Sequence, residues 1–77
     1  MARLKTRDRV LLFVRSYIET IHVPPTRQEI AKGCGLAHSN VQYHLEALDR
    51  TGSISLMPNK ARGIRLNQGR ELLNGKT

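Results

Sequence analysis

Apolar side chains recur along the start of the chain at the spacing of an α-helix. The stripe that they form consists of Val10, Phe13, Val14, Tyr17, Ile18 and Ile21. Because an α-helix has about 3.6 residues per turn, this spacing places the stripe on one face, which can pack against a core. The pattern predicts a first helix over about residues 7–20, with Thr6 as its N-cap.

A second, shorter helix is predicted after the proline pair 24–25, which cannot continue the first helix. The next four residues have the capping-box pattern. The Thr26 side chain can accept a hydrogen bond from the backbone of Glu29, and the Glu29 carboxylate can reach back to the backbone of Thr26. This start predicts a helix over about 27–32, which the glycine-rich segment 33–35 ends.

A third helix follows this turn. Val41, Leu45 and Leu48 are spaced to face inward from a helix over about residues 38–51, and a glycine ends it. Leu36 is expected to fill the core from the turn. Two short helices joined by a glycine-containing turn are typical of a helix-turn-helix.

The pattern changes to alternation after the third helix. Residues 53–56 and 63–66 alternate polar and apolar side chains, which is typical of half-buried strands, and turn residues lie between them. This predicts a two-stranded antiparallel hairpin, or wing, beside the third helix. The expected fold is mainly α with a small β part, a winged helix-turn-helix in residues 1–67. Residues 68–77 are expected to be a polar tail, in which a leucine pair can form a short helical turn.

Composition limits the function classes. The 77 residues suffice for one compact domain, and no apolar run reaches the roughly 18 residues that span a bilayer. The apolar stretch behind the basic start is too short for a signal peptide. Cys34 is the single cysteine, so the chain has no internal disulfide and a reducing cytoplasm is expected. The 13 Lys and Arg residues against 6 Asp and Glu residues give a net charge of +7, which favours a polyanionic partner.

The exposed face of the third helix is the strongest indication of function. This face is rich in hydroxyl, amide and imidazole groups, where an ordinary solvated helix favours Lys, Glu and Ala. Asn and Gln can form bidentate hydrogen bonds to adenine in the major groove, and the first residues of such a helix point at base edges. We therefore predict binding to double-stranded DNA, with base contacts from His38, Ser39, Asn40, Gln42 and Tyr43. Without that role, Ser39 would only cap the helix, and the amides would be ordinary surface.

Phosphate contacts are expected on either side of this helix. The free backbone N–H groups and the dipole at the start of the second helix suit an anion. Cations also lie in the hairpin loop and near the start of the first helix. The predicted contacts are Thr26, Arg27, Gln28, Lys60, Arg62 and Arg7, with Arg9 beside them. Such contacts set affinity and register but carry no sequence information. Each of these cations can alternatively be an ordinary solvated side chain.

The sequence gives no sign of catalysis, of a metal site or of a bound cofactor. His22, His38 and His44 lack the i, i+4 spacing of a helical metal pair. His44 adjoins Leu45, so we expect a partly buried imidazole with one hydrogen bond. Cys34 lies in a glycine turn with no convincing base nearby, and no glycine-rich phosphate loop follows a strand. An enzyme fragment is therefore disfavoured.

Two segments resemble the N-terminal DNA-binding domain of LexA, the SOS-response repressor. They are Val23-Pro24-Pro25-Thr26-Arg27-Gln28-Glu29-Ile30-Ala31 and Arg62-Gly63-Ile64-Arg65-Leu66. Between them, His44-Leu45-Glu46-Ala47-Leu48 is similar to the end of that family's recognition helix. The resemblance covers about residues 4–66. It implies a bacterial, nucleoid-associated repressor domain that binds an inverted-repeat operator as a homodimer and is monomeric or weakly associated when free.

The chain departs from the family in two ways. The segment 35–44 is about one residue shorter than in the family, so the resemblance carries a base-contact role only to Asn40 and does not imply the family's operator. The self-cleaving Ser/Lys protease half, which also supplies most of the dimerisation, has no counterpart in the 77 residues. The chain is thus expected to be either a domain of a longer repressor or a stand-alone regulator.

One alternative belongs to a different class, namely a winged helix whose polar face binds protein within a larger assembly. Salt dependence separates the two hypotheses, because binding to DNA phosphates releases condensed counterions. Affinity for DNA therefore falls steeply as salt is added, whereas a protein-binding module has no such phosphate-dependent response.

Overall fold

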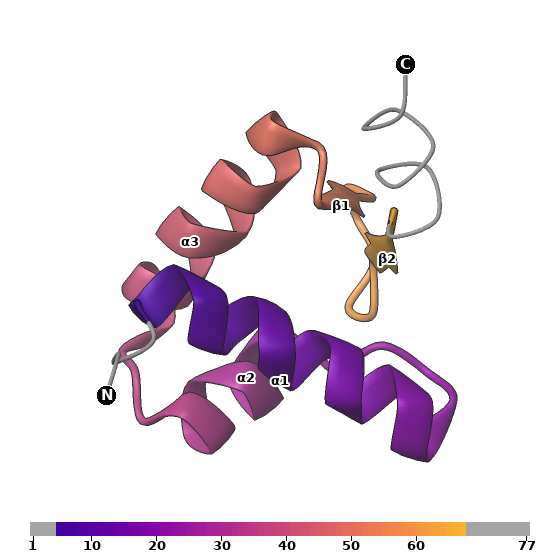
Figure 1. The fold of residues 1–77 in the computed structure, drawn as a ribbon, viewed down its shortest axis with the longest axis horizontal. Coiled ribbons are helices and arrows are strands. Elements are labelled where there is room, and N and C mark those ends of the chain that lie inside the picture. Colours follow the sequence, from indigo (N-terminus) through magenta and orange to yellow (C-terminus); the bar gives the residue numbers. More distant parts are fainter. Residues whose placement is uncertain (1–4, 68–77) are drawn as a thin grey trace.

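A computed structural model describes residues 5–67 as three helices followed by a two-stranded antiparallel sheet. The helices are α1 (Thr6–Ile21), α2 (Arg27–Cys34) and α3 (His38–Thr51), and the strands are β1 (Ile54–Leu56) and β2 (Ile64–Leu66). α1 crosses in front of α2, and the hairpin follows the C-terminal end of α3 (Figure 1). This is the predicted winged helix-turn-helix. The predicted tail, 68–77, lies outside the described residues.

The starts of α2 and α1 differ in how well the neighbouring residues predicted their N-caps. α2 begins at the predicted capping box, in which Thr26 Oγ1 accepts from the backbone N–H of Glu29 at 3.1 Å and Glu29 Oε1 accepts from that of Thr26 at 2.9 Å. α1 begins at Thr6 itself, because the carbonyl of Lys5 already accepts from the N–H of Arg9. Lys5 holds the N-cap position without a side-chain bond, so the predicted Thr6 cap is wrong.

The turn between α2 and α3 begins two residues later than predicted. Gly33 lies inside α2, where the ring of Phe13 occupies the space that a Cβ would need. The left-handed residue that ends the helix is Gly35, with a φ of 67°, and its N–H bonds to the carbonyl of Ala31. Leu36 then packs half-buried against the core, as predicted.

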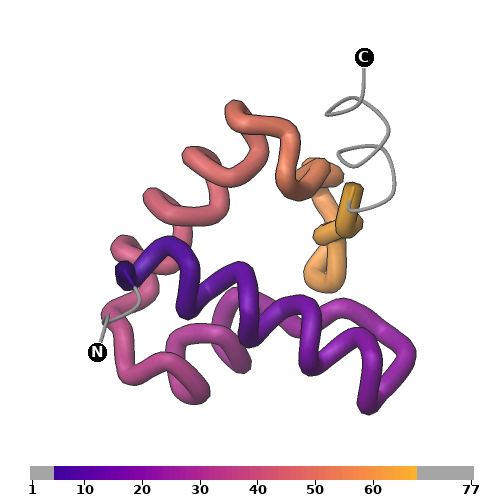
Figure 2. The backbone as a smooth tube through the Cα atoms, viewed as in Figure 1, coloured from indigo at the N-terminus to yellow at the C-terminus, as the bar shows by residue number. Residues whose placement is uncertain are grey.

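Side chains from every element meet in one core. Its buried members are Val10, Val14, Ile30, Cys34, Val41, Leu45, Leu48, Ile54 and Ile64. The predicted inward positions of α3 are confirmed, and Val10 and Val14 form the centre of the stripe on α1. Ile21 belongs to the same stripe but is 50% exposed, because the last turn of α1 extends beyond the core (Figure 2).

The hairpin is antiparallel, and each strand is one residue shorter at its start than predicted. Ile54 pairs with Leu66, and Leu56 pairs with Ile64. Ile54 and Ile64 turn into the core and fix the hairpin to the helices. In the described part of the chain, no helix combines the length and hydrophobicity that crossing a bilayer requires.

Candidate nucleic-acid interface

α3 carries an exposed polar face opposite the side that packs in the core. His38, Ser39 and Asn40 form its exposed first turn. None of them caps the helix, because Ala37 holds the N-cap position without a side-chain bond. Tyr43 lies further along α3 and is 58% exposed. Four of the five predicted base contacts are therefore exposed on α3.

Gln42, the fifth predicted base contact, is half-buried and has two side-chain partners. Its Oε1 accepts from Arg27 Nε at 2.6 Å, and its Nε2 donates to Glu46 Oε2 at 2.8 Å. Arg27 is the first residue of α2, so the contact joins the start of α2 to the polar face of α3. Sequence reasoning missed this network, although the i, i+4 spacing of Gln42 and Glu46 was a signal for half of it.

The hairpin loop is attached to the start of α2 through Arg62. The Arg62 guanidinium donates to the carbonyl of Pro24 at 2.8 Å and to the two carboxylate oxygens of Glu29 at 3.0 and 3.1 Å. Glu29 Oε1 thus accepts from Arg62 and from the backbone N–H of Thr26 at the same time. Arg62, a predicted phosphate contact, therefore has donors engaged within the protein.

The bridge to Arg62 has an electrostatic consequence at Glu29. The side-chain hydrogen bond from Arg62, and next the backbone hydrogen bond from Thr26, lower the pKa of Glu29 from 4.5 to about 2. A carboxyl whose pKa is depressed by folding stabilises the native state fully above its unfolded pKa. The stabilisation from Glu29 is therefore complete above about pH 4.5 and is lost as the pH falls through about 2.

A carboxyl-carbon NMR titration of the 77-residue chain should show Glu29 titrating near pH 2. In Arg62→Ala the midpoint should rise toward 4.5, because the largest cause of the pKa shift is removed. Lys60→Ala removes a neighbouring cation of the same loop and should leave the midpoint unchanged. A native midpoint close to 4.5 would contradict the pairing.

Three side-chain contacts join predicted residues across neighbouring elements, and we call the surface that carries these residues the polar interface. They join Arg7 to Tyr43 as a cation–π contact of 5.9 Å, Arg27 to Gln42, and Arg62 to Glu29. The starts of α1 and α2, the polar face of α3 and the hairpin loop are therefore neighbours. Gln28 and Lys60 are exposed on these elements, and Thr26 is half-buried in the capping box.

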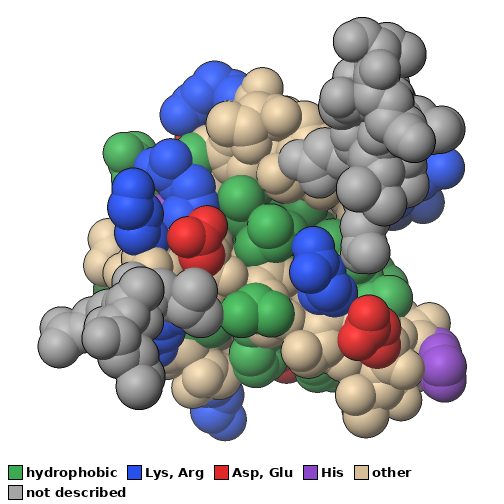
Figure 3. All heavy atoms as spheres, in the orientation of Figure 1, with side chains coloured by type: hydrophobic (Ala, Val, Ile, Leu, Met, Phe, Trp, Pro, Cys, Tyr) green, Lys and Arg blue, Asp and Glu red, His purple; other side chains and the backbone are tan. Residues whose placement is uncertain are grey.

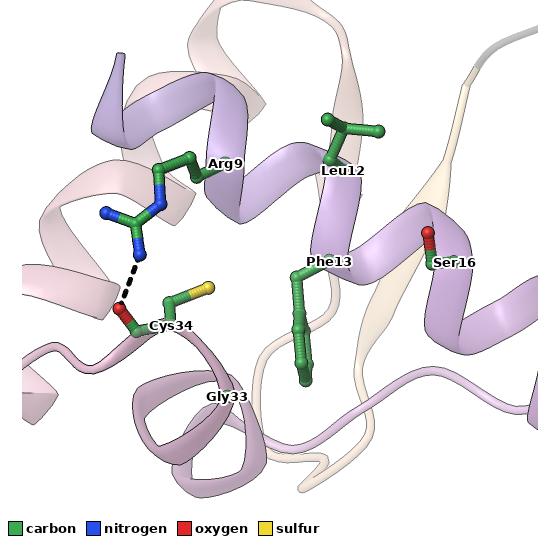
Figure 4. Close-up of a pocket in the computed structure, with 6 residues that line it drawn as sticks. All are labelled: Arg9, Leu12, Phe13, Ser16, Gly33 and Cys34. Atoms are coloured by element: carbon green, nitrogen blue, oxygen red, sulfur yellow. Dashed lines mark hydrogen bonds between the residues drawn. The ribbon is translucent and has the colours of Figure 1, made fainter. Parts of the chain in front are cut away.

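An open hollow lies between α1 and the C-terminal end of α2. It is lined by Arg9, Leu12, Phe13, Ser16, Gly33 and Cys34 (Figure 4). Arg9 donates to the carbonyl of Cys34 at 2.8 Å, at the end of α2 opposite to the capping box. Burial raises the pKa of the Cys34 thiol, which disfavours the reactive thiolate.

Apolar side chains also gather over the middle of α1 on the face shown in Figure 3.

The predictions for His44 and for a metal site concern the remaining titratable side chains of residues 5–67. His44 is half-buried on α3, and its Nδ1 is buried without a hydrogen-bond partner, so the predicted hydrogen bond is not made at this nitrogen. Its ring meets that of Tyr43 edge-on, with centroids 5.2 Å apart. Over residues 5–67, no three His, Cys, Asp or Glu side chains are grouped as a metal site requires.

Comparisons with known proteins identify the family to which the chain belongs. A family model described as the LexA DNA binding domain matches residues 1–63. LexA repressor 2 of Xanthomonas campestris pv. campestris is 43% identical over 67 residues, which cover 86% of this chain and 32% of that repressor. The LexA repressor of Saccharophagus degradans is 46% identical over 68 residues, which cover 86% of this chain and 34% of that repressor. The LexA repressor of Cellvibrio japonicus is 41% identical over 63 residues, which cover 80% of this chain and 32% of that repressor.

The chain therefore spans about a third of the length of these repressors. The match covers α1, α2, α3 and the hairpin loop as far as Gly63, and so every element of the polar interface. The resemblance that the sequence motifs indicated is confirmed, and the chain belongs to the LexA DNA-binding domain family.

Proposed function

We propose that the chain is a sequence-specific, double-stranded DNA-binding module of a LexA-like transcriptional repressor or regulator. The observation that carries the proposal is the exposed first turn of α3, which offers His38, Ser39 and Asn40 while the opposite side of the helix is held in the core. An α-helix fits the major groove, and its first residues come nearest to the base edges. The relatives are named as repressors, which supports a role in transcription.

Phosphate contacts are proposed from the elements that flank α3. They come from Arg7, Arg27, Lys60, Thr26 and Gln28. The backbone N–H groups and the dipole at the start of α2 attract an anion there. Arg62, which is bonded to Pro24 and Glu29, is proposed to hold the hairpin loop in place so that Lys60 reaches the DNA backbone.

Two copies are proposed to bind one operator. Helix-turn-helix dimers bind half-sites about one turn of DNA apart, so operator symmetry reflects the symmetry of the protein. The free chain is proposed to be monomeric or weakly dimeric, and to meet its operator in the bacterial nucleoid.

Selection of bound sequences from a random duplex pool tests this proposal with the 77-residue chain. We expect one recurring site, and an inverted repeat within it if two copies bind. The absence of any enrichment over the starting pool would overturn the proposal.

Asn40→Ala should lower the preference for one base at one position of the selected site by about 1–3 kcal/mol, because a bidentate contact to that base is lost. Competition between the selected duplex and its single-base variants measures this. Thr20→Ala, at an exposed position on α1, should leave all preferences unchanged. If Asn40→Ala weakened binding to selected and random duplexes equally, Asn40 would not be a base contact.

A further inference from the structure

The side-chain amide of Gln42 is held at both ends by groups of fixed polarity. The guanidinium of Arg27 can only donate hydrogen bonds, and the carboxylate of Glu46 can only accept them. Arg27 Nε lies 2.6 Å from Oε1 of Gln42, and Nε2 of Gln42 lies 2.8 Å from Glu46 Oε2. Turning the amide over would set its NH₂ group against a donor and its oxygen against an acceptor. The two partners therefore fix one orientation of the amide.

These two bonds leave part of the hydrogen-bonding capacity of the Gln42 amide unused. A glutamine amide has two N–H donors and an oxygen with two acceptor sites. One donor is used by Glu46 and one acceptor site by Arg27, so one of each remains. Gln42 is half-buried, but its partner Glu46, one turn further along the same face of α3, is exposed. The remaining donor and acceptor of Gln42 can therefore meet a ligand at this face.

The unused donor and acceptor of the Gln42 amide match one base. In the major groove, adenine presents an acceptor at N7 and a donor at N6, whereas guanine presents acceptors at both N7 and O6. One donor and one acceptor satisfy adenine, but guanine requires two donors. We propose that Arg27 and Glu46 are positioning residues that fix Gln42 for adenine and against guanine. This inference rests on the proposed function, in which α3 enters the major groove.

The charge of Glu46 gives the proposal a signature that a structural role would not produce. A carboxylate close to DNA phosphates opposes binding to every sequence. Replacing it by an amide should therefore strengthen binding to random DNA. The same replacement removes the fixed polarity beside Gln42, because a glutamine at position 46 can donate as well as accept. Affinity for random DNA and selectivity should thus change in opposite directions.

The test compares Glu46→Gln with Asp49→Asn, which removes an equal charge from an exposed position of the same helix. Gln42→Ala first identifies the base position that Gln42 contacts. There, the unmodified chain should prefer adenine over guanine by about tenfold or more. Glu46→Gln should reduce that preference to about threefold or less, with random DNA bound at least as tightly. Asp49→Asn should keep the preference for adenine. Gln42→Ala combined with Glu46→Gln should show the same base preference at this position as Gln42→Ala alone.

Amide hydrogen exchange in the free chain gives a second readout that needs no DNA. The side-chain N–H groups of Gln42 should exchange more slowly than those of the exposed Asn40, and Glu46→Gln should reduce the difference. A selected site whose adenine preference survives Glu46→Gln would overturn this inference and leave the proposed function intact. A chain that selects no site would overturn both.

Discussion

Raising the salt concentration from about 50 to about 200 mM should weaken DNA binding by about 40-fold for each bound copy of the chain. The proposed phosphate contacts include three cations, Arg7, Arg27 and Lys60. Each neutralised phosphate adds about −0.9 to the slope of log K against log salt, so the expected slope is about −2.7. The binding constant for a duplex of the selected sequence, measured over a salt series, gives this slope directly.

Lys60→Ala should make that slope shallower by about 1 and should weaken all sequences alike. Arg50→Ala is the matched control, because Arg50 is exposed in the last turn of α3, outside the polar interface. It should leave the slope unchanged. A flat salt response of the unmodified chain would contradict DNA binding and would favour the protein-binding alternative for this winged helix.

Leu45→Ala should lower the free energy of unfolding by about 2–5 kcal/mol, because it leaves a cavity where α3 meets the core. Leu45 is completely buried within the core cluster. A small domain has a total stability of about 5–15 kcal/mol, so the loss is a large share of the stability of this domain. Circular dichroism should show Tm lowered by on the order of 10–30 °C.

Leu12→Ala is the control for Leu45→Ala, since it removes the same atoms from a side chain that is 43% exposed on α1. Its effect on Tm should be a small fraction of the effect of Leu45→Ala. Equal losses from the two variants would mean that Leu45 is not at the centre of the core. DNA binding by Leu12→Ala should remain, because Leu12 lines the hollow that opens between α1 and the end of α2.

The sequence predicted the elements well where the signal was local. The capping box at Thr26 and Glu29 fixes the first residue of α2 by bonds between near neighbours, and helical spacing places Val41 and Leu45 inward. The end of α2 could not be predicted, because Gly33 is an ordinary helical residue whose missing Cβ makes room for Phe13. The need for a residue without a Cβ comes from Phe13 on another helix, so the residues around Gly33 in the sequence do not indicate it.

The same distinction applies to the polar interface. Periodicity correctly predicted that Asn40 and its neighbours in the first turn face outward. It could not predict that Arg27 meets Gln42, or that Arg62 meets Glu29 across 33 residues of sequence. Long side chains select their partners only after the helices have packed. Roles assigned to single cations from sequence therefore depend on neighbours that the sequence does not reveal.

Glu29 Oε1 accepts both from the backbone N–H of Thr26, the N-cap residue of α2, and from the guanidinium of Arg62 in the hairpin loop. The start of α2 and the hairpin should therefore open as one cooperative unit. When Arg62 leaves the Glu29 carboxylate, the start of α2 loses the cation that pairs with its capping carboxylate. Detachment of the hairpin and fraying of α2 should therefore occur together. A substitution at either Glu29 or Arg62 removes the link between the two elements and leaves the other side chain to solvent. In a lineage of such domains, the two positions should consequently be exchanged as a pair.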